Sequence, residues 1–139
     1  MIDVTIDRSK WRCGMYGESS HGRGEVSMLN SEGFMCCLGF ASLAIGVEEA
    51  ALKGCDYPVD VARKDETAAK VLLGCDFVIT DSEAHLRYRH TPPIIEAATA
   101  NDDGILTSRQ RESKVRAALK KVGMKVEFVG KYHKRKVPA

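Results

Sequence analysis

The chain has 139 residues, of which 44% are hydrophobic and 29% charged, a size and composition typical of one water-soluble domain with one hydrophobic core. No apolar run approaches the roughly 20 residues that a membrane-spanning helix needs. The first residues lack the basic flank and the apolar stretch of a secretion signal, so we expect a cytoplasmic protein that has no membrane partner.

The net charge of +2 conceals two parts of opposite sign. From Arg109 to the end, 11 Lys or Arg residues stand against 2 acidic residues, a balance of +9. The first 108 residues hold 10 basic and 17 acidic residues, a balance of −7. A basic end indicates an anionic partner or self-association of unlike surfaces, although a solvated helix face with a soluble tail is the more ordinary interpretation.

The cysteines do not suggest a disulfide scaffold, because their number is odd and no secretion signal accompanies them. They are Cys13, Cys36, Cys37, Cys55 and Cys75. We expect reduced thiols that pack as small hydrophobic side chains.

The first third of the chain shows strand and helix signals around a glycine-rich stretch. Apolar and polar residues alternate over 2–7, which predicts a half-buried strand, and four glycines between 14 and 24 predict a loop. Residues 25–29 are predicted to form a second strand, and 30–33 fit a type I turn. The almost wholly apolar stretch 36–45 predicts a buried helix that the following glycine ends.

The middle of the chain gives weaker signals. Short helices are predicted over 47–53 and 94–100, the second after two prolines that suit a first helical turn. Between them, residues 66–73 favour a helix and 77–79 a strand.

A longer amphipathic helix and a final strand are predicted near the C-terminus. Thr107 and Gln110 have the spacing of a capping box, and one apolar stripe follows over 108–122. Apolar residues then alternate with others over 124–129, which predicts a strand. The basic residues 131–139 are expected to fray.

Together these elements predict an α+β fold with a single domain over 1–130 and a basic tail over 131–139. We expect a modest, mostly antiparallel sheet that includes strands from both ends of the domain. Three or four short helices are expected to pack against this sheet.

A vicinal cysteine pair opens the helix predicted over 36–45, within the run Met35-Cys36-Cys37-Leu38-Gly39. Together with flanking residues over 23–46 and a later Asn101-Asp102 pair ahead of a charged helix, this run resembles a group of small bacteriophage-encoded proteins of unknown function. The resemblance implies a phage or prophage accessory gene. Small phage genes often encode inhibitors of host enzymes or defences, and that analogy suggests a host-interaction role.

The cysteine pair also raises the hypothesis of nucleophilic catalysis. A thiol at a helix N-terminus has a lowered pKa, and His85, His90, Asn101 or Asp102 would complete a catalytic set with Cys36 or Cys37. In the alternative interpretation the two small residues, together with Gly39, let the helix approach the sheet closely. We favour packing, because the flanking sequence matches no cysteine-protease signature.

A second hypothesis is binding of a phosphate-bearing ligand. On a strand, His85, Arg87 and Arg89 would share one face, and guanidinium groups bind phosphates in a bidentate manner. A charged edge strand explains the same pattern. Asn101 and Asp102 are further candidates for ligand binding, although helix-exit and turn chemistry is the favoured interpretation of these residues. We expect no metal and no cofactor: His85 and His90 have a spacing that suits zinc, but no suitably spaced cysteine pair accompanies them.

A third hypothesis is a nucleic-acid surface on the basic C-terminal helix and tail. Its candidates are Arg109, Arg116, Lys120, Lys134 and Arg135. The first three fall roughly on one helical stripe, but nearby basic residues spread away from it.

These observations favour a protein that acts by binding over an enzyme. The expected partner is a host protein or a phosphorylated small molecule such as a signal nucleotide, which the protein would sequester or inhibit. If the ligand is a nucleotide, we expect a homo-oligomer that binds it in pockets between subunits. The alternatives are a cysteine-dependent hydrolase that uses Cys36 or Cys37 and a nucleic-acid-binding protein.

Overall fold

The computed structural model describes residues 1–15, 20–56 and 92–133. In these residues the chain forms, in order, β1 (Ile2–Asp7), the 3₁₀ turn η1 (Arg8–Lys10), α1 (Cys37–Ala44), α2 (Glu49–Leu52), α6 (Pro92–Asp102), α7 (Ser108–Lys120) and β2 (Met124–Val129). The helix and strand predicted over 66–73 and 77–79 lie outside the described residues. The described part is α+β, as the sequence predicts.

The sheet is the main correction to the predicted fold, because among the described residues it consists of two parallel strands rather than being mostly antiparallel. Ile2 lies opposite Met124, and the register continues to Asp7 opposite Val129. Residue alternation reports which side chains are buried but carries no information on strand direction. The sequence correctly predicts that strands from both ends of the domain share this sheet.

Residues 25–29 do not form the predicted strand. Only Leu29 makes a bridge, with Lys53, and the surrounding backbone pairs irregularly: the Ser27 carbonyl accepts from the Cys36 amide at 3.0 Å, and the Met28 amide donates to the Cys55 carbonyl at 3.2 Å. This segment therefore lies against the start of α1 and the end of α2 instead of extending the sheet.

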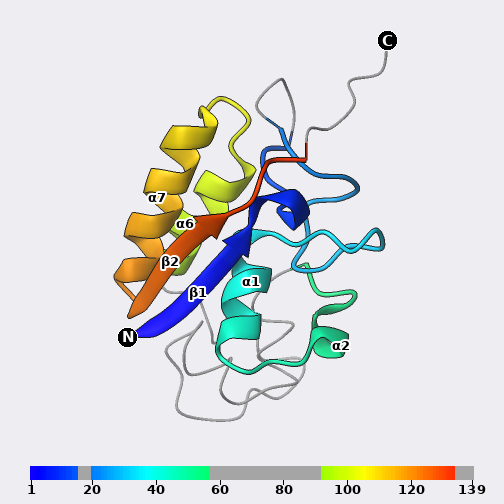
Figure 1. The fold of residues 1–139 in the computed structure, drawn as a ribbon, viewed down its shortest axis with the longest axis horizontal. Coiled ribbons are helices and arrows are strands. Elements are labelled where there is room, and N and C mark those ends of the chain that lie inside the picture. The colour runs from blue at the N-terminus through cyan, green and yellow to red at the C-terminus, as the bar shows by residue number, and fades with distance from the viewer. Residues whose placement is uncertain (16–19, 57–91, 134–139) are drawn as a thin grey trace.

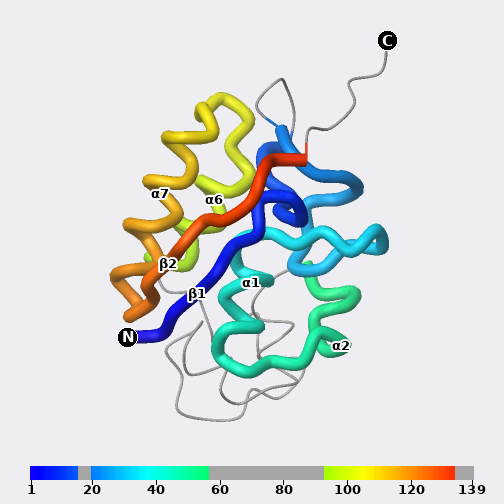
Figure 2. Tube along the Cα trace, in the orientation of Figure 1, coloured from blue at the N-terminus to red at the C-terminus, as the bar shows by residue number. Residues whose placement is uncertain are grey.

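The core lies between the buried face of the sheet and the helices. Val4 and Ile6 of β1 and Val126 and Phe128 of β2 point inward, while the residues between them are exposed or partly exposed. Figures 1 and 2 show the two strands side by side, with α7 next to β2 and α1 on the side of β1 away from β2. Trp11, fully buried, lies 5.1 Å from the Phe128 ring centre.

Helix α1 is buried over most of its surface, as its all-round apolar sequence predicts. Gly39 shows how closely it packs: a Cβ at this position would lie 2.1 Å from the Met28 carbonyl oxygen. Close packing of this motif is therefore supported. The element against which Gly39 packs is the 26–29 segment, however, and not the sheet as expected.

The capping box of α7 is confirmed. The backbone N–H of Gln110 donates to the Thr107 hydroxyl, and the side-chain oxygen of Gln110 accepts from the backbone N–H of Thr107. Residues 131–133, the described part of the expected basic tail, are held against the rest of the protein instead of fraying. Tyr132 donates to Glu112, and the His133 carbonyl accepts from the Gly22 amide at 2.6 Å. Lys134 and Arg135 lie outside the described residues.

Candidate functional site

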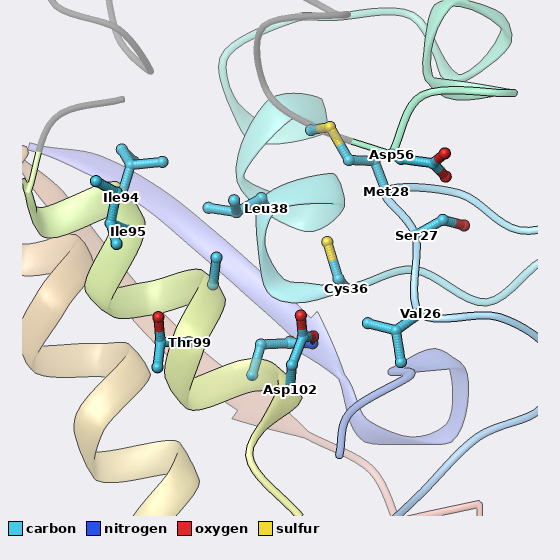
Figure 3. Close-up of a pocket in the computed structure, with 12 residues that line it drawn as sticks. Val26, Ser27, Met28, Cys36, Leu38, Asp56, Ile94, Ile95, Thr99 and Asp102 are labelled. Atoms are coloured by element: carbon cyan, nitrogen blue, oxygen red, sulfur yellow. The ribbon is translucent and has the colours of Figure 1, made fainter. Parts of the chain in front are cut away.

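A cavity of about 210 Å³ opens between the start of α1, the 26–28 segment and α6 (Figure 3). Most of its wall is apolar and comes from Val26, Met28, Leu38, Ile94, Ile95 and Ala98. Leu38 of α1 reaches toward Ile94 and Ile95 of α6 (Figure 3). The two helices that the sequence predicts as separate apolar elements thus form opposite walls of one site.

The polar part of the lining carries acidic but no basic groups among the described residues. It consists of Ser27, Cys36, Asp56, Thr99, Asn101 and Asp102. The site therefore joins Cys36 from the vicinal cysteine pair with the Asn101-Asp102 pair, which the sequence places 65 residues apart. Such a mixture of an apolar wall and a few convergent polar groups is usual for a ligand site.

Cys36 is the N-cap residue of α1 and is 8% exposed, with its sulfur directed into the cavity (Figure 3). Burial raises the pKa of the Cys36 thiol to about 11, and the charge of Asp102 acts in the same direction. Hydrogen bonding to nearby backbone groups opposes this shift without cancelling it. The thiol therefore stays protonated at neutral pH, unlike an activated nucleophile.

Cys37 lies deeper and is fully buried, with its thiol directed at the Ala97 carbonyl at 3.6 Å. Burial raises the pKa of Cys37 well above its usual value, and the neighbouring Cys36 raises it further. His85 and His90, the histidines of the hydrolase hypothesis, lie outside the described residues. The described geometry favours packing for both thiols over catalysis.

Asn101 is fully enclosed and all of its side-chain hydrogen-bonding capacity meets protein groups. Its Oδ1 accepts from Trp11 Nε1 at 2.7 Å and from the Cys37 amide at 2.8 Å. Its Nδ2 donates to the Arg12 carbonyl at 3.1 Å and to Asp102 Oδ1 at 3.0 Å. Asn101 thus joins the N-terminal segment, α1 and α6, and it shapes the cavity from behind.

Asp102, at the C-terminal end of α6, is one of the two acidic residues that line the cavity. Burial raises its pKa, while the hydrogen bond from Asn101 and the charges of Arg12 and Arg111 oppose the rise. The Asp102 carboxyl therefore offers a hydrogen-bond acceptor to a ligand in the cavity.

Arg12 and Arg111 are buried cations that the sequence analysis did not single out. Arg12 Nε donates to the Gly24 carbonyl at 2.7 Å, and Arg111 Nη2 donates to the Asp103 carbonyl at 2.6 Å. Their guanidinium groups thus fasten loop backbones. One signal was available for Arg111, because it stands four residues before Val115 on the apolar stripe of α7.

A second polar cluster, away from the cavity lining, also escaped the sequence analysis. His21 Nε2 lies 2.8 Å from the Ser108 hydroxyl, and the His21 ring stacks on Tyr132 with ring centres 4.1 Å apart. Arg8 bonds both carboxylate oxygens of Glu112, at 2.9 and 2.7 Å. These contacts attach the loop around residue 21 to α7 and to the C-terminal segment, and they attach η1 to α7.

The predicted site residues fall into three groups. Asn101 and Asp102 lie together at the cavity, whereas His85, Arg87 and Arg89 are outside the described residues. Arg109, Arg116 and Lys120 are exposed along α7, and the Arg116 guanidinium lies 5.2 Å from the Phe128 ring centre. Three of the cations proposed for nucleic-acid binding are therefore accessible, but none of them lines the cavity.

In the part of the chain that the structure describes, no helix is long and apolar enough to cross a membrane. The same residues contain no group of three or more His, Cys, Asp or Glu side chains arranged to hold a metal ion. Comparison of the chain with family models, curated proteins and solved structures finds no match.

Proposed function

We propose that the protein acts by binding a host component, and that the cavity between α1 and α6 is its recognition site. The observation that carries this proposal is the combination of an apolar wall with an acceptor group at one end, Asp102. Such a site takes an apolar group that carries a neutral hydrogen-bond donor. The resemblance of the Cys36-Cys37 region to phage proteins supplies the expectation that the component belongs to a host.

The size of the cavity favours one side chain of a partner protein over a nucleotide. Its volume of about 210 Å³ lies below the roughly 300–1,000 Å³ of sites for small-molecule ligands. Interfaces between proteins commonly depend on one or two anchor side chains that fill such small pockets. A host protein is therefore the better supported of the two expected partners.

The charge of the cavity argues in the same direction. Asp56 and Asp102 line it, and none of its described lining residues is a Lys, Arg or His. A phosphate group would meet like charge there without a compensating donor fork. Catalysis by Cys36 has less support than binding, because its raised pKa leaves little thiolate at neutral pH.

Four small probes with the same branched carbon skeleton test the chemistry of the site. They are isovaleramide, isovalerate, isopentylamine and isopentyl phosphate, titrated while the methyl signals of Leu38, Ile94 and Ala98 are followed by NMR. We expect isovaleramide to bind with about millimolar affinity, since ligands of this size gain limited free energy, and the two anions to bind at least tenfold more weakly. Stronger binding of the phosphate would overturn the proposed site chemistry.

A blocked cavity tests the link between this site and a partner. In Ala98→Phe the added ring fills the cavity, and Ala50→Phe places the same ring on the exposed surface of α2 as the control. We expect host proteins retained by the wild-type protein and by Ala50→Phe to be lost with Ala98→Phe, and to be released by isovaleramide. Equal retention by all three proteins would show that recognition occurs elsewhere.

A further inference from the structure

Within residues 1–15, 20–56 and 92–133, the sheet has two strands and no third strand pairs with the outer edge of β1. The Ile2 amide donates to the Gly123 carbonyl at 2.9 Å, so the backbone groups of Ile2 point toward β2. Because these groups alternate along a strand, those of Val4 and Ile6 also face β2 in the parallel register. The backbone groups of the residues between them therefore face the opposite edge.

That outer edge is accessible over its central part. Asp3 and Thr5 are exposed, and their backbone N–H and C=O groups make no hydrogen bond within the described part of the protein. Beyond β1, the next backbone hydrogen bond to a distant segment is at the end of η1, where the Met35 amide donates to the Lys10 carbonyl at 3.0 Å. Sheets of two strands are narrower than usual, and open edges of this kind accept further strands.

We propose that the outer edge of β1 binds an extended segment of a partner protein in which basic residues alternate with apolar ones. This segment would add a third strand to the sheet through the backbone groups of Asp3 and Thr5. The proposal concerns a different surface from the α1–α6 cavity and does not depend on the function proposed for it.

The two faces of β1 determine the chemistry of this partner. On the solvent face, Asp3 and Asp7 flank Thr5, so opposite charges on the added strand are favoured over like charges. On the inner face the added strand would lie over α1, which flanks β1 on this side and whose Leu43 is only partly buried (Figure 1). Apolar side chains suit that position.

A second copy of the same strand is a poorer occupant. Antiparallel pairing of two β1 strands about Thr5 would place Asp3 of each copy opposite Asp7 of the other, and like charges in such pairs are destabilising. The same acidic residues that select a basic partner therefore oppose self-association through this edge.

Amide hydrogen exchange measured by NMR tests the proposal with a capped heptapeptide of alternating lysine and valine. We expect this peptide to slow the exchange of the Asp3 and Thr5 amides about tenfold or more, while the Lys125 and Glu127 amides, already bonded within the sheet, change little. A heptapeptide of alternating glutamate and valine is the matched control. Equal protection by both peptides, or by neither at millimolar concentration, would overturn the proposal.

Two pairs of variants separate edge binding from other effects. Thr5→Pro removes the outward amide and should abolish protection of Asp3, whereas Thr5→Val keeps the amide and should preserve it. Asp3→Lys should weaken binding of the lysine peptide, and Glu127→Lys, the same charge change on β2, should weaken it less. A concentration-dependent dimer that protects Asp3 without peptide would instead assign the edge to self-association and refute the proposed partner.

Discussion

At the scale of single residues, Asn101 determines how three distant parts of the protein meet. Its amide group satisfies the Trp11 indole, the first amide of α1 and the Arg12 carbonyl at once. A hydroxyl or carboxylate of similar size cannot supply the two acceptor and two donor bonds that this position uses. The residue therefore has a structural role that explains its place in the motif without any contact with a ligand.

Replacing Asn101 with alanine should destabilise the protein strongly. The buried Trp11 Nε1 and Cys37 amide would each lose their acceptor, and a buried donor without one costs roughly 1–3 kcal/mol. We expect the free energy of unfolding, measured with urea, to fall by about 3 kcal/mol. Asp103→Ala, which removes one exposed bond to the Ile105 amide, should cost less than about 1 kcal/mol. A loss for Asn101→Ala no larger than that of the control would contradict this role.

At the scale of the element, α1 owes its position to a contact with irregular backbone. Its apolar sequence predicts burial, but the partner of its Gly39 face is the Met28 carbonyl, in a segment without regular pairing. The helix consequently separates the sheet from the 26–29 segment and leaves its first turn beside the cavity. Packing of one glycine thus contributes to the geometry of the candidate site.

Gly39→Ala distinguishes this contact from helix propensity by the sign of its effect. Alanine is better than glycine within a helix by about 1 kcal/mol, whereas a Cβ placed 2.1 Å from the Met28 oxygen forces the backbone apart. We expect a net destabilisation of about 2 kcal/mol in thermal or urea unfolding. Gly123→Ala is the comparison for backbone strain without a clash, about 1–2 kcal/mol, since φ there is +81° and no atom lies near the added Cβ. Stabilisation by Gly39→Ala would disprove the contact.

At the scale of the whole molecule, the two ends of the chain close the fold. β1 and β2 pair with each other, and Tyr132 stacks near Trp11 with ring centres 6.0 Å apart. Cys36 and Cys37 lie inside the structure that this pairing completes. Access to their thiols should therefore report on opening of the fold.

Alkylation of these thiols should be slow in the native protein and fast after unfolding. A pKa of about 11 for Cys36, against an ordinary 9.0, lowers the thiolate fraction at neutral pH about a hundredfold, and burial slows the reaction further. Because the folded pKa is raised, this thiol's contribution to stability is present below pH 9 and is lost as the pH rises toward 11. Iodoacetamide labelling followed by peptide mass spectrometry measures this site by site. Rapid native labelling of Cys36 at pH 7.5 would favour the hydrolase alternative.

The sequence by itself determined the local features whose causes are local. The alternation in β1 and β2, the capping box of α7 and the apolar surface of α1 each depend on neighbours within one or two turns of chain. Prediction of these elements was therefore sound, and so was the α+β class. The acidic and thiol components of the candidate site were also visible as motifs, although not as one site.

Only the tertiary structure decided how these elements combine. Strand direction, the loss of the strand at 25–29 and the burial of Arg12 and Arg111 depend on partners far away in the chain. The cavity exists because Asn101 brings the end of α6 against the start of α1, a contact between residues 64 positions apart. Residue patterns encode which side chains seek burial, whereas the pairing that buries them is settled by packing of the whole chain.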